Sequence, residues 1–168
     1  MFPRQYLRSV STTRLCRRIR APRSVVYGVL VDAHSVQQWM VPDGMTSEVH
    51  VFDPREGGEF RISLTYDLPT TVGKTSAQTD SFHGRFVELV PDSKVVQMVE
   101  FETDDPAMMG EMTISYVLAD ATDGTDLVGV HEGLPPGVSP ADNELGWRIS
   151  IDKLARLAER CQPTPPAS

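Results

Sequence analysis

Residues 112–160 read MTISYVLADATDGTDLVGVHEGLPPGVSPADNELGWRISIDKLARLAER, and this stretch decides the fold class. Every second residue over 112–118 is apolar, which is typical of a strand with one buried face. Asp123-Gly124 then predicts a tight hairpin turn, and a second strand follows over 127–132. The stretch therefore begins as an antiparallel β-hairpin.

A linker and a long helix follow the hairpin. Residues 133–140 contain three prolines and two glycines, so we expect neither a helix nor a strand there. Ser139 or Asp142 is the predicted cap of a helix that runs to about Arg160. Its apolar stripe is formed by Leu145, Trp147, Ile149, Ile151, Leu154, Leu157 and Ala158. We expect this helix to cover one face of a sheet, because it is the only element long enough to do so.

Four more strands are predicted upstream of the hairpin. They lie over 47–52, 60–66, 82–90 and 95–102, and a polar loop over 67–80 separates the middle two. Short turns between strands favour an antiparallel sheet, and strands grouped apart from helices favour an α+β fold.

Two short helices are predicted ahead of these strands, over Val25–Leu30 and Val36–Met40. Residues 1–20 contain six arginines and no acidic residue. This composition fits an organelle transit peptide, or a basic leader that runs into an edge strand. We favour a strand over 14–20, because these residues lead directly into the first helix.

The expected domain spans 11–160, after a leader at 1–10 and before a disordered tail at 161–168. Its elements would follow the order strand, two short helices, six strands and long helix. We therefore expect a curved, seven-stranded antiparallel sheet wrapped around the C-terminal helix, in a single soluble α+β domain.

Composition limits the partners and the location. The 168 residues carry a formal net charge of −7, whereas nucleic acid or an anionic membrane surface needs clustered Lys and Arg. No run of 18 apolar residues is present, so no membrane span is expected. Cys16 and Cys161 form no metal motif. A disulfide between them is one alternative, but free thiols in a reducing cytoplasm are the simpler interpretation. We therefore expect a cytoplasmic protein.

Six segments of the chain carry a family resemblance, and together they span about 14–160. They are Ile19–Pro22, Val36–Met45, Phe52–Phe60, Gly84–Pro91, His131–Gly133 and Gly146–Leu154. In order and spacing they resemble the START-like (SRPBCC) superfamily, and within it the family named for the activator of the heat-shock protein 90 ATPase. The family often has two adjacent tryptophans where this chain has Trp39-Met40, which changes the shape of the mouth of any cavity.

The resemblance implies a helix-grip fold with an internal cavity between the sheet and the last helix. It does not choose one activity, because the superfamily includes lipid carriers, hormone receptors, cyclases and co-chaperone domains. The resemblance therefore adds a fold and a place for a ligand, and the function has to be argued from the residues.

Ligand pockets are mostly apolar, with a few polar groups that fix orientation. The candidate ligand-binding residues are Trp39, Phe60, Ile62, Tyr66, Phe86, Met98, Met112, Ile114, His131, Trp147 and Ile151. The apolar members could equally be ordinary core residues. His131 could orient the polar end of a ligand or act as an acid or base, or it could simply bond a backbone carbonyl and water.

Carboxylates on the strands leave a further question open. Glu88, Glu100 and Glu102 would be costly if they pointed inward without a partner, and unremarkable if they faced solvent. Arg61 and Arg85 are the expected counter-charges on adjacent strands.

The sequence contains no motif for a metal site, a serine nucleophile or a phosphate-binding loop. The four histidines are scattered, no Gly-x-Ser-x-Gly occurs, and Gly57-Gly58 lacks the lysine of a phosphate loop. We therefore expect no metal and no cofactor. We expect the protein to be a monomer or a homodimer. The leading hypothesis is a non-catalytic binder of a small apolar or amphipathic molecule. The alternatives are a co-chaperone-like module that binds a chaperone or other protein, and a cyclase or hydratase that uses His131.

Overall fold

The computed structural model describes residues 11–67 and 79–161 and contains the expected elements in the expected order. They are β1 (Thr12–Ile19), α1 (Arg23–Leu30), α2 (Ala33–Trp39), β2 (Met45–Phe52), β3 (Glu59–Tyr66), β4 (Thr79–Val90), β5 (Lys94–Phe101), β6 (Met112–Ala121), β7 (Gly124–Glu132) and α3 (Pro140–Arg160). The predicted leader and all but the first residue of the predicted tail lie outside the described residues.

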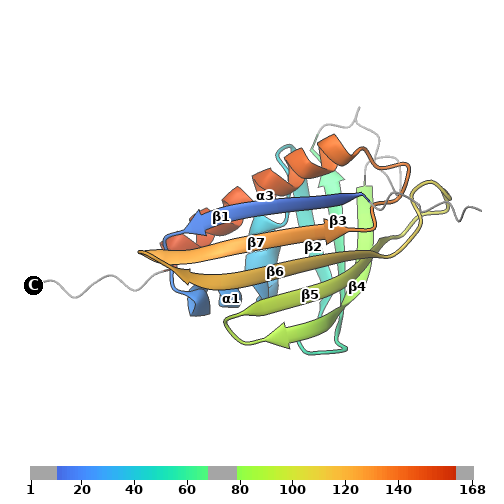
Figure 1. The fold of residues 1–168 in the computed structure, drawn as a ribbon. Coiled ribbons are helices and arrows are strands. Elements are labelled where there is room, and N and C mark those ends of the chain that lie inside the picture. Colours follow the sequence, from blue (N-terminus) through green and yellow to red (C-terminus); the bar gives the residue numbers. More distant parts are fainter. Residues whose placement is uncertain (1–10, 68–78, 162–168) are drawn as a thin grey trace, which may run out of the picture.

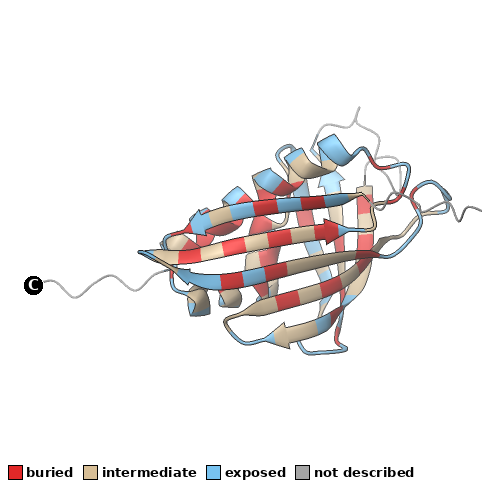
Figure 2. Ribbon diagram, in the orientation of Figure 1, coloured by how far each residue is buried: buried red, intermediate tan, exposed pale blue. Residues whose placement is uncertain are grey.

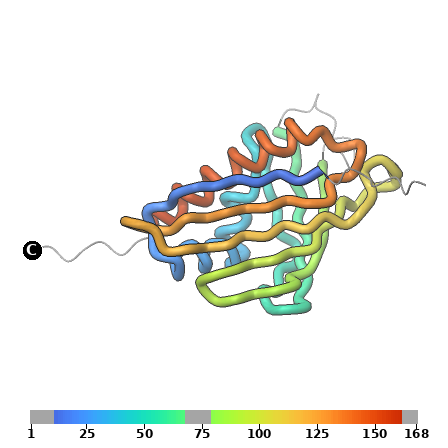
Figure 3. Tube along the Cα trace, viewed as in Figure 1, coloured from blue at the N-terminus to red at the C-terminus, as the bar shows by residue number. Residues whose placement is uncertain are grey.

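The seven strands form one sheet in the order β1-β7-β6-β5-β4-β3-β2, and every neighbouring pair is antiparallel. The path is a meander from β2 to β7, with β1 added beside β7 as an edge strand (Figures 1 and 3). Helices α1 and α2 connect β1 at one edge to β2 at the other. The prediction of an edge strand from the basic segment is therefore confirmed for β1.

Alternation along the strands separates an inner from an outer face. Figure 2 shows buried residues recurring at every second position of β7, and β1 keeps the same alternation except at Arg17, which is partly buried. Register shifts in the β2–β3 pair, between Val49 and Val51, and in the β4–β5 pair, between Phe86 and Glu88, interrupt the ladders. Such bulges bend strands and increase twist, which helps the sheet to curve around the helix.

Helix α3 packs on the inner side, against β1, α1 and α2 (Figure 1). Ser139 is its cap, since the side-chain hydroxyl accepts from the Asp142 backbone N–H at 3.3 Å, and Pro140 occupies the first turn. Leu154, Ala155 and Ala158 are fully buried. The expected apolar stripe is wrong at Leu145, which is 60% exposed. No helix in the described residues is long and apolar enough to cross a membrane.

The candidate site is an internal cavity

A cavity of about 650 Å³ lies between the inner face of the sheet and the N-terminal half of α3. Its volume falls within the range of ligand pockets, roughly 300–1,000 Å³. Strands β3 to β7 form its floor, the end of α2 and α3 form its sides, and most of the lining is apolar. The chain thus forms a hollow, open at its mouth, of the size that a small organic molecule occupies.

Seven of the candidate residues line this cavity: Trp39, Phe60, Tyr66, Met112, Ile114, His131 and Trp147. Three others, Ile62, Phe86 and Ile151, are buried in the surrounding core and are not part of the wall. Met98 lies on the opposite face of the sheet, where its sulfur accepts from the Thr113 hydroxyl at 3.1 Å. The reason is the strand period: Gln97 and Val99 on either side of Met98 face inward.

Several wall residues were missed by the sequence argument. They are Leu64, Phe82, Gln97, Val99, Phe101, Tyr116, Asn143 and Ser150. Leu64, Phe82 and Tyr116 continue a clear period-two pattern, so alternation alone predicts them, whereas the apolar run on β5 hides the alternation at Gln97, Val99 and Phe101. Asn143 and Ser150 could not be found in this way, because their placement depends on how α3 is rotated over the sheet.

Aromatic rings form one corner of the cavity. The ring of Tyr116 lies 6.2 Å from that of Trp147 and 6.2 Å from that of Trp39, both edge to face. The Trp39 indole N–H donates to the Val29 carbonyl at 3.1 Å. Burial raises the pKa of Tyr116 far above its ordinary value, against a small opposing effect of the Trp147 indole N–H beside it. Tyr116 is therefore an uncharged wall residue.

His131 sits beside this corner and is 5% exposed. Its ring lies 5.7 Å from that of Trp147. The Asn143 amide nitrogen lies 3.1 Å from Nδ1, and Nε2 lies 3.3 Å from the Met112 sulfur. An amide N–H donor at Nδ1 leaves the ring proton on Nε2, where it meets only a weak thioether acceptor. Burial lowers the pKa of His131 to about 4, so the ring is neutral at physiological pH.

Three contacts hold the mouth of the cavity. Lys153 of α3 donates to the Val41 carbonyl at 2.6 Å and lies 3.1 Å from the Asp43 carboxylate. On the other side, the Gly137 backbone N–H donates to the Ala107 carbonyl at 2.7 Å. The helix and the linker before it are thus tied to the loops that border the cavity.

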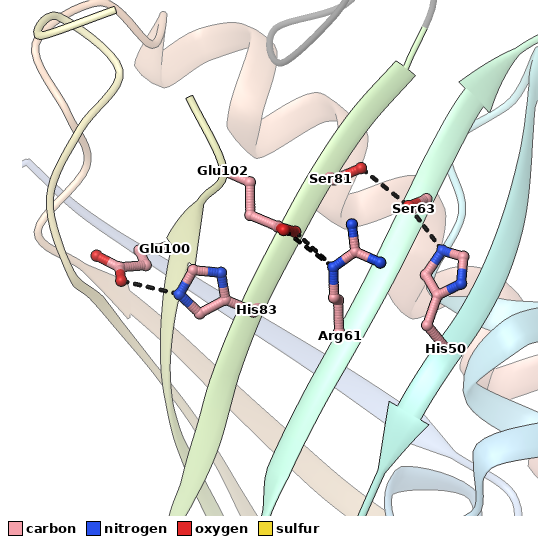
Figure 4. A network of polar contacts seen from close by, with 7 residues as sticks. All are labelled: His50, Arg61, Ser63, Ser81, His83, Glu100 and Glu102. Atoms are coloured by element: carbon pink, nitrogen blue, oxygen red, sulfur yellow. Dashed lines mark hydrogen bonds and ion pairs between the residues drawn. The ribbon is translucent and has the colours of Figure 1, made fainter. Parts of the chain in front are cut away.

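The outer face carries a polar network (Figure 4). Arg61 pairs with Glu102 at 2.9 Å, and His83 with Glu100 at 2.9 Å. Glu88 pairs with Lys94 at 3.1 Å. These contacts answer the question about the strand carboxylates, because all three glutamates are paired on the solvent side of the sheet.

A second group in the same network resembles a hydrolase dyad but lacks its surroundings. His50 Nε2 lies 2.9 Å from the Ser63 hydroxyl, which in turn lies 2.9 Å from that of Ser81 (Figure 4). These side chains do not line the internal cavity. Within the described residues no cluster of His, Cys, Asp and Glu could hold a metal ion. We therefore place the candidate site in the cavity and not on this face.

A curved antiparallel sheet that closes on a C-terminal helix over an internal cavity defines a helix-grip protein of the START-like class. The chain belongs to the family described as activator of Hsp90 ATPase homolog 1-like proteins, whose profile matches residues 20–159.

Solved structures agree with this assignment. Protein CV1439 from Chromobacterium violaceum is 33% identical, with a TM-score of 0.79 over 88% of this chain and 96% of that one. The AHSA1 protein from Silicibacter pomeroyi is 19% identical, with a TM-score of 0.72 over 88% of this chain and 96% of that one. Protein Ms6760 from Mycobacterium smegmatis is 12% identical, with a TM-score of 0.69 over 95% and 98%. The last two likenesses concern the fold alone. Among curated proteins no match is found.

Proposed function

We propose that this protein binds one small apolar or amphipathic molecule in its internal cavity. The observation that carries the proposal is the cavity itself, about 650 Å³ lined mostly by apolar side chains and open at its mouth. A core packed for stability alone leaves few spaces larger than a water molecule. An apolar hollow of this size exposes its walls to water, and a bound apolar molecule would remove that surface from water.

A carrier role fits the polar groups of the wall better than proton-transfer catalysis does. A general base works best with a pKa near the operating pH, and the pKa of His131 lies about three units below neutrality, at about 4. The ring is suited to hold an oxygen of a ligand through Nε2–H. The cyclase or hydratase alternative therefore requires that ligand binding raise the pKa of His131.

The family name supplies the co-chaperone alternative, in which the protein would stimulate a chaperone ATPase. A protein-interaction module would be expected to have a filled interior and a contiguous exposed apolar patch of several hundred Å². The large cavity favours the small-molecule ligand. The co-chaperone role becomes the leading function if the cavity proves unable to bind anything.

Native mass spectrometry of freshly purified protein tests the proposal first. A stoichiometric mass increment that is lost on denaturation would support it, and the extracted molecule would give the ligand class. The neutral dye N-phenyl-1-naphthylamine provides a second readout, because its fluorescence rises in an apolar site. Protein that carries no ligand and binds neither this dye nor sterols would contradict the proposal.

A matched pair of variants on β6 locates the binding site. Ile114→Phe adds volume to the cavity floor, whereas Val117→Phe adds the same ring at an outward position that is 42% exposed. We expect Ile114→Phe to weaken dye binding about tenfold, a change of about 1.4 kcal/mol. Val117→Phe should leave dye binding unchanged. Equal effects of both substitutions would place the dye outside the cavity.

A further inference from the structure

Two buried side-chain atoms in the cavity wall make no hydrogen bond within the described part of the chain. They are Oε1 of Gln97, which accepts, and Nε1 of Trp147, which donates and lies beside the Tyr116 hydroxyl outside hydrogen-bonding geometry. Buried polar atoms in proteins are nearly always paired, because an unpaired one loses its hydration without compensation. An unpaired acceptor and an unpaired donor on one cavity wall indicate a ligand that carries polar groups.

Gln97 occupies a defined place on the cavity floor. In the register of the sheet it lies opposite Ile114, which in turn lies opposite His131. Residues directly opposite on antiparallel strands point to the same face, so the three form one row across β5, β6 and β7. With strands about 4.8 Å apart, the backbones of Gln97 and His131 are separated by about 10 Å.

The polar side chains at the two ends of this row differ in the hydrogen bonds that they already make. His131 already bonds Asn143 through Nδ1 and faces the Met112 sulfur through Nε2. Gln97 is 3% exposed, and its amide oxygen has no partner among the described residues. Gln97 therefore offers the unpaired acceptor of the row, whereas His131 could only donate, through an Nε2–H that already faces a weak acceptor.

The charges around the cavity select against an anionic ligand. The charged residues of its described wall are Asp43, Asp80, Asp105 and Asp142, with no lysine or arginine among them. Asp43 is paired with Lys153 near the mouth. Among the described residues of the wall, a buried ligand carboxylate would meet carboxylates of the protein and no lysine or arginine, which is unfavourable.

We propose that the ligand is an uncharged molecule with a hydroxyl group, and that the Gln97 carboxamide binds this hydroxyl. This inference rests on the proposed binding function. A hydroxyl donates to Oε1 and also accepts hydrogen bonds, so it satisfies the amide in either orientation of the group. An ether or a hydrocarbon leaves Oε1 without a partner. The Trp147 N–H offers a further donor to an oxygen of the same ligand.

Three probes that share one ring system test the proposal. They are 2-naphthol, 2-methoxynaphthalene and 2-naphthoate, compared at neutral pH by displacement of N-phenyl-1-naphthylamine. We expect 2-naphthol to bind about tenfold more tightly than the other two, as one well-formed buried hydrogen bond allows. Burial of apolar surface alone would favour the methyl ether, so the expected order opposes the hydrophobic effect.

Gln97→Met keeps the length of the side chain and removes the amide. In this variant the preference for 2-naphthol over the ether should fall from about tenfold to about twofold or less, because the hydrogen bond that produces the tenfold preference is gone. Affinity for 2-methoxynaphthalene should stay near that of the unchanged protein. Gln38→Met, on the exposed face of α2, is the matched control and should retain the full preference.

The outcomes separate this inference from the proposed function. If the unchanged protein binds all three probes without preferring the hydroxyl, the role of Gln97 is overturned and the binding function stands. If none of the probes binds and no dye is displaced, both proposals are overturned. The comparison of probes on the unchanged protein gives a result even if Gln97→Met fails to fold.

Discussion

The indole of Trp147 lies across the backbone of Gly129, so that a β-carbon at Gly129 would come within 2.8 Å of two indole carbons. Trp147 also contacts Tyr116 and His131 and forms part of the cavity wall. One glycine on β7 therefore sets the depth at which the largest side chain of α3 can sit over the sheet.

Gly129→Ala should displace this ring and destabilise the protein. Overpacking at such a site costs typically about 1–3 kcal/mol. Urea unfolding measures the loss, and the tryptophan emission spectrum reports the displaced ring. Gly28→Ala in α1 is the control, because its β-carbon would meet nothing within 4 Å. This change should stabilise the helix by about 0.5–1 kcal/mol. The same sign for both substitutions would contradict the packing described for Trp147.

The two tryptophans should respond differently to the same substitution. Val29 is among the last carbonyls of α1, which have no partner within the helix, and the Trp39 indole N–H bonds it. The Trp147 indole N–H lies beside the Tyr116 hydroxyl but makes no hydrogen bond within the described residues. Trp39→Phe should therefore lower the free energy of unfolding by about 1–2 kcal/mol more than Trp147→Phe, because it leaves the buried Val29 carbonyl without its hydrogen bond. Equal losses in chemical denaturation would show that the Trp39 bond contributes nothing.

His131 should make the stability fall in mild acid. Its pKa is about 4 in the folded protein and about 6.5 in the unfolded chain, so the unfolded chain binds more protons between these values. The free energy of unfolding should decrease as the pH falls from about 6.5 to 4, by up to about 3 kcal/mol from this residue.

His131→Gln isolates this contribution. Unfolding curves measured at several pH values should lose most of their slope between about pH 6.5 and 4 in this variant, because the titrating group is gone. The carboxylates remain in both proteins, so the difference between the curves belongs to His131. His83→Gln is the control, since the His83 side chain is partly exposed on the outer face, where it pairs with Glu100. An unchanged slope in His131→Gln would show that burial of the ring does not depress its pKa.

Much of the fold follows from local patterns in the sequence. Period-two alternation predicts the strands to within three residues of their observed starts, and Ser139, one of the two predicted caps, begins α3. The pattern was less informative on β5, where apolar residues on both sides of Gln97 hide the alternation. Hydrophobicity favoured Met98 as a cavity residue, although Gln97 is the one that lines the cavity.

The contacts of the site depend on how distant elements meet, and this limits what a single sequence can predict. His131 and Asn143 belong to β7 and α3, and their hydrogen bond requires the rotation of α3 that also exposes Leu145. The fit of Trp147 over Gly129 depends on the same rotation. These contacts follow from long-range packing, for which neither periodicity nor capping carries a signal.

Lys153 should control both stability and the rate at which a ligand leaves. It bonds the Val41 carbonyl at 2.6 Å and ties α3 to the loop that follows α2. Lys153→Met keeps the apolar stem and removes this bond, so we expect a loss of about 1–3 kcal/mol, in the range for bonds to charged groups. Asp43→Asn removes only the carboxylate partner, which is 76% exposed, and should cost about 0–1 kcal/mol.

Stopped-flow dissociation of N-phenyl-1-naphthylamine separates a role at the mouth from a purely structural one. Asp43 and Met40 line the cavity on either side of Val41, so a loop released from α3 opens the path for the dye. Lys153→Met should therefore release the dye several-fold faster than Asp43→Asn, under conditions in which both variants stay folded. If Lys153→Met lost stability while the dye left at an unchanged rate, the Lys153–Val41 contact would hold the fold together without gating the cavity.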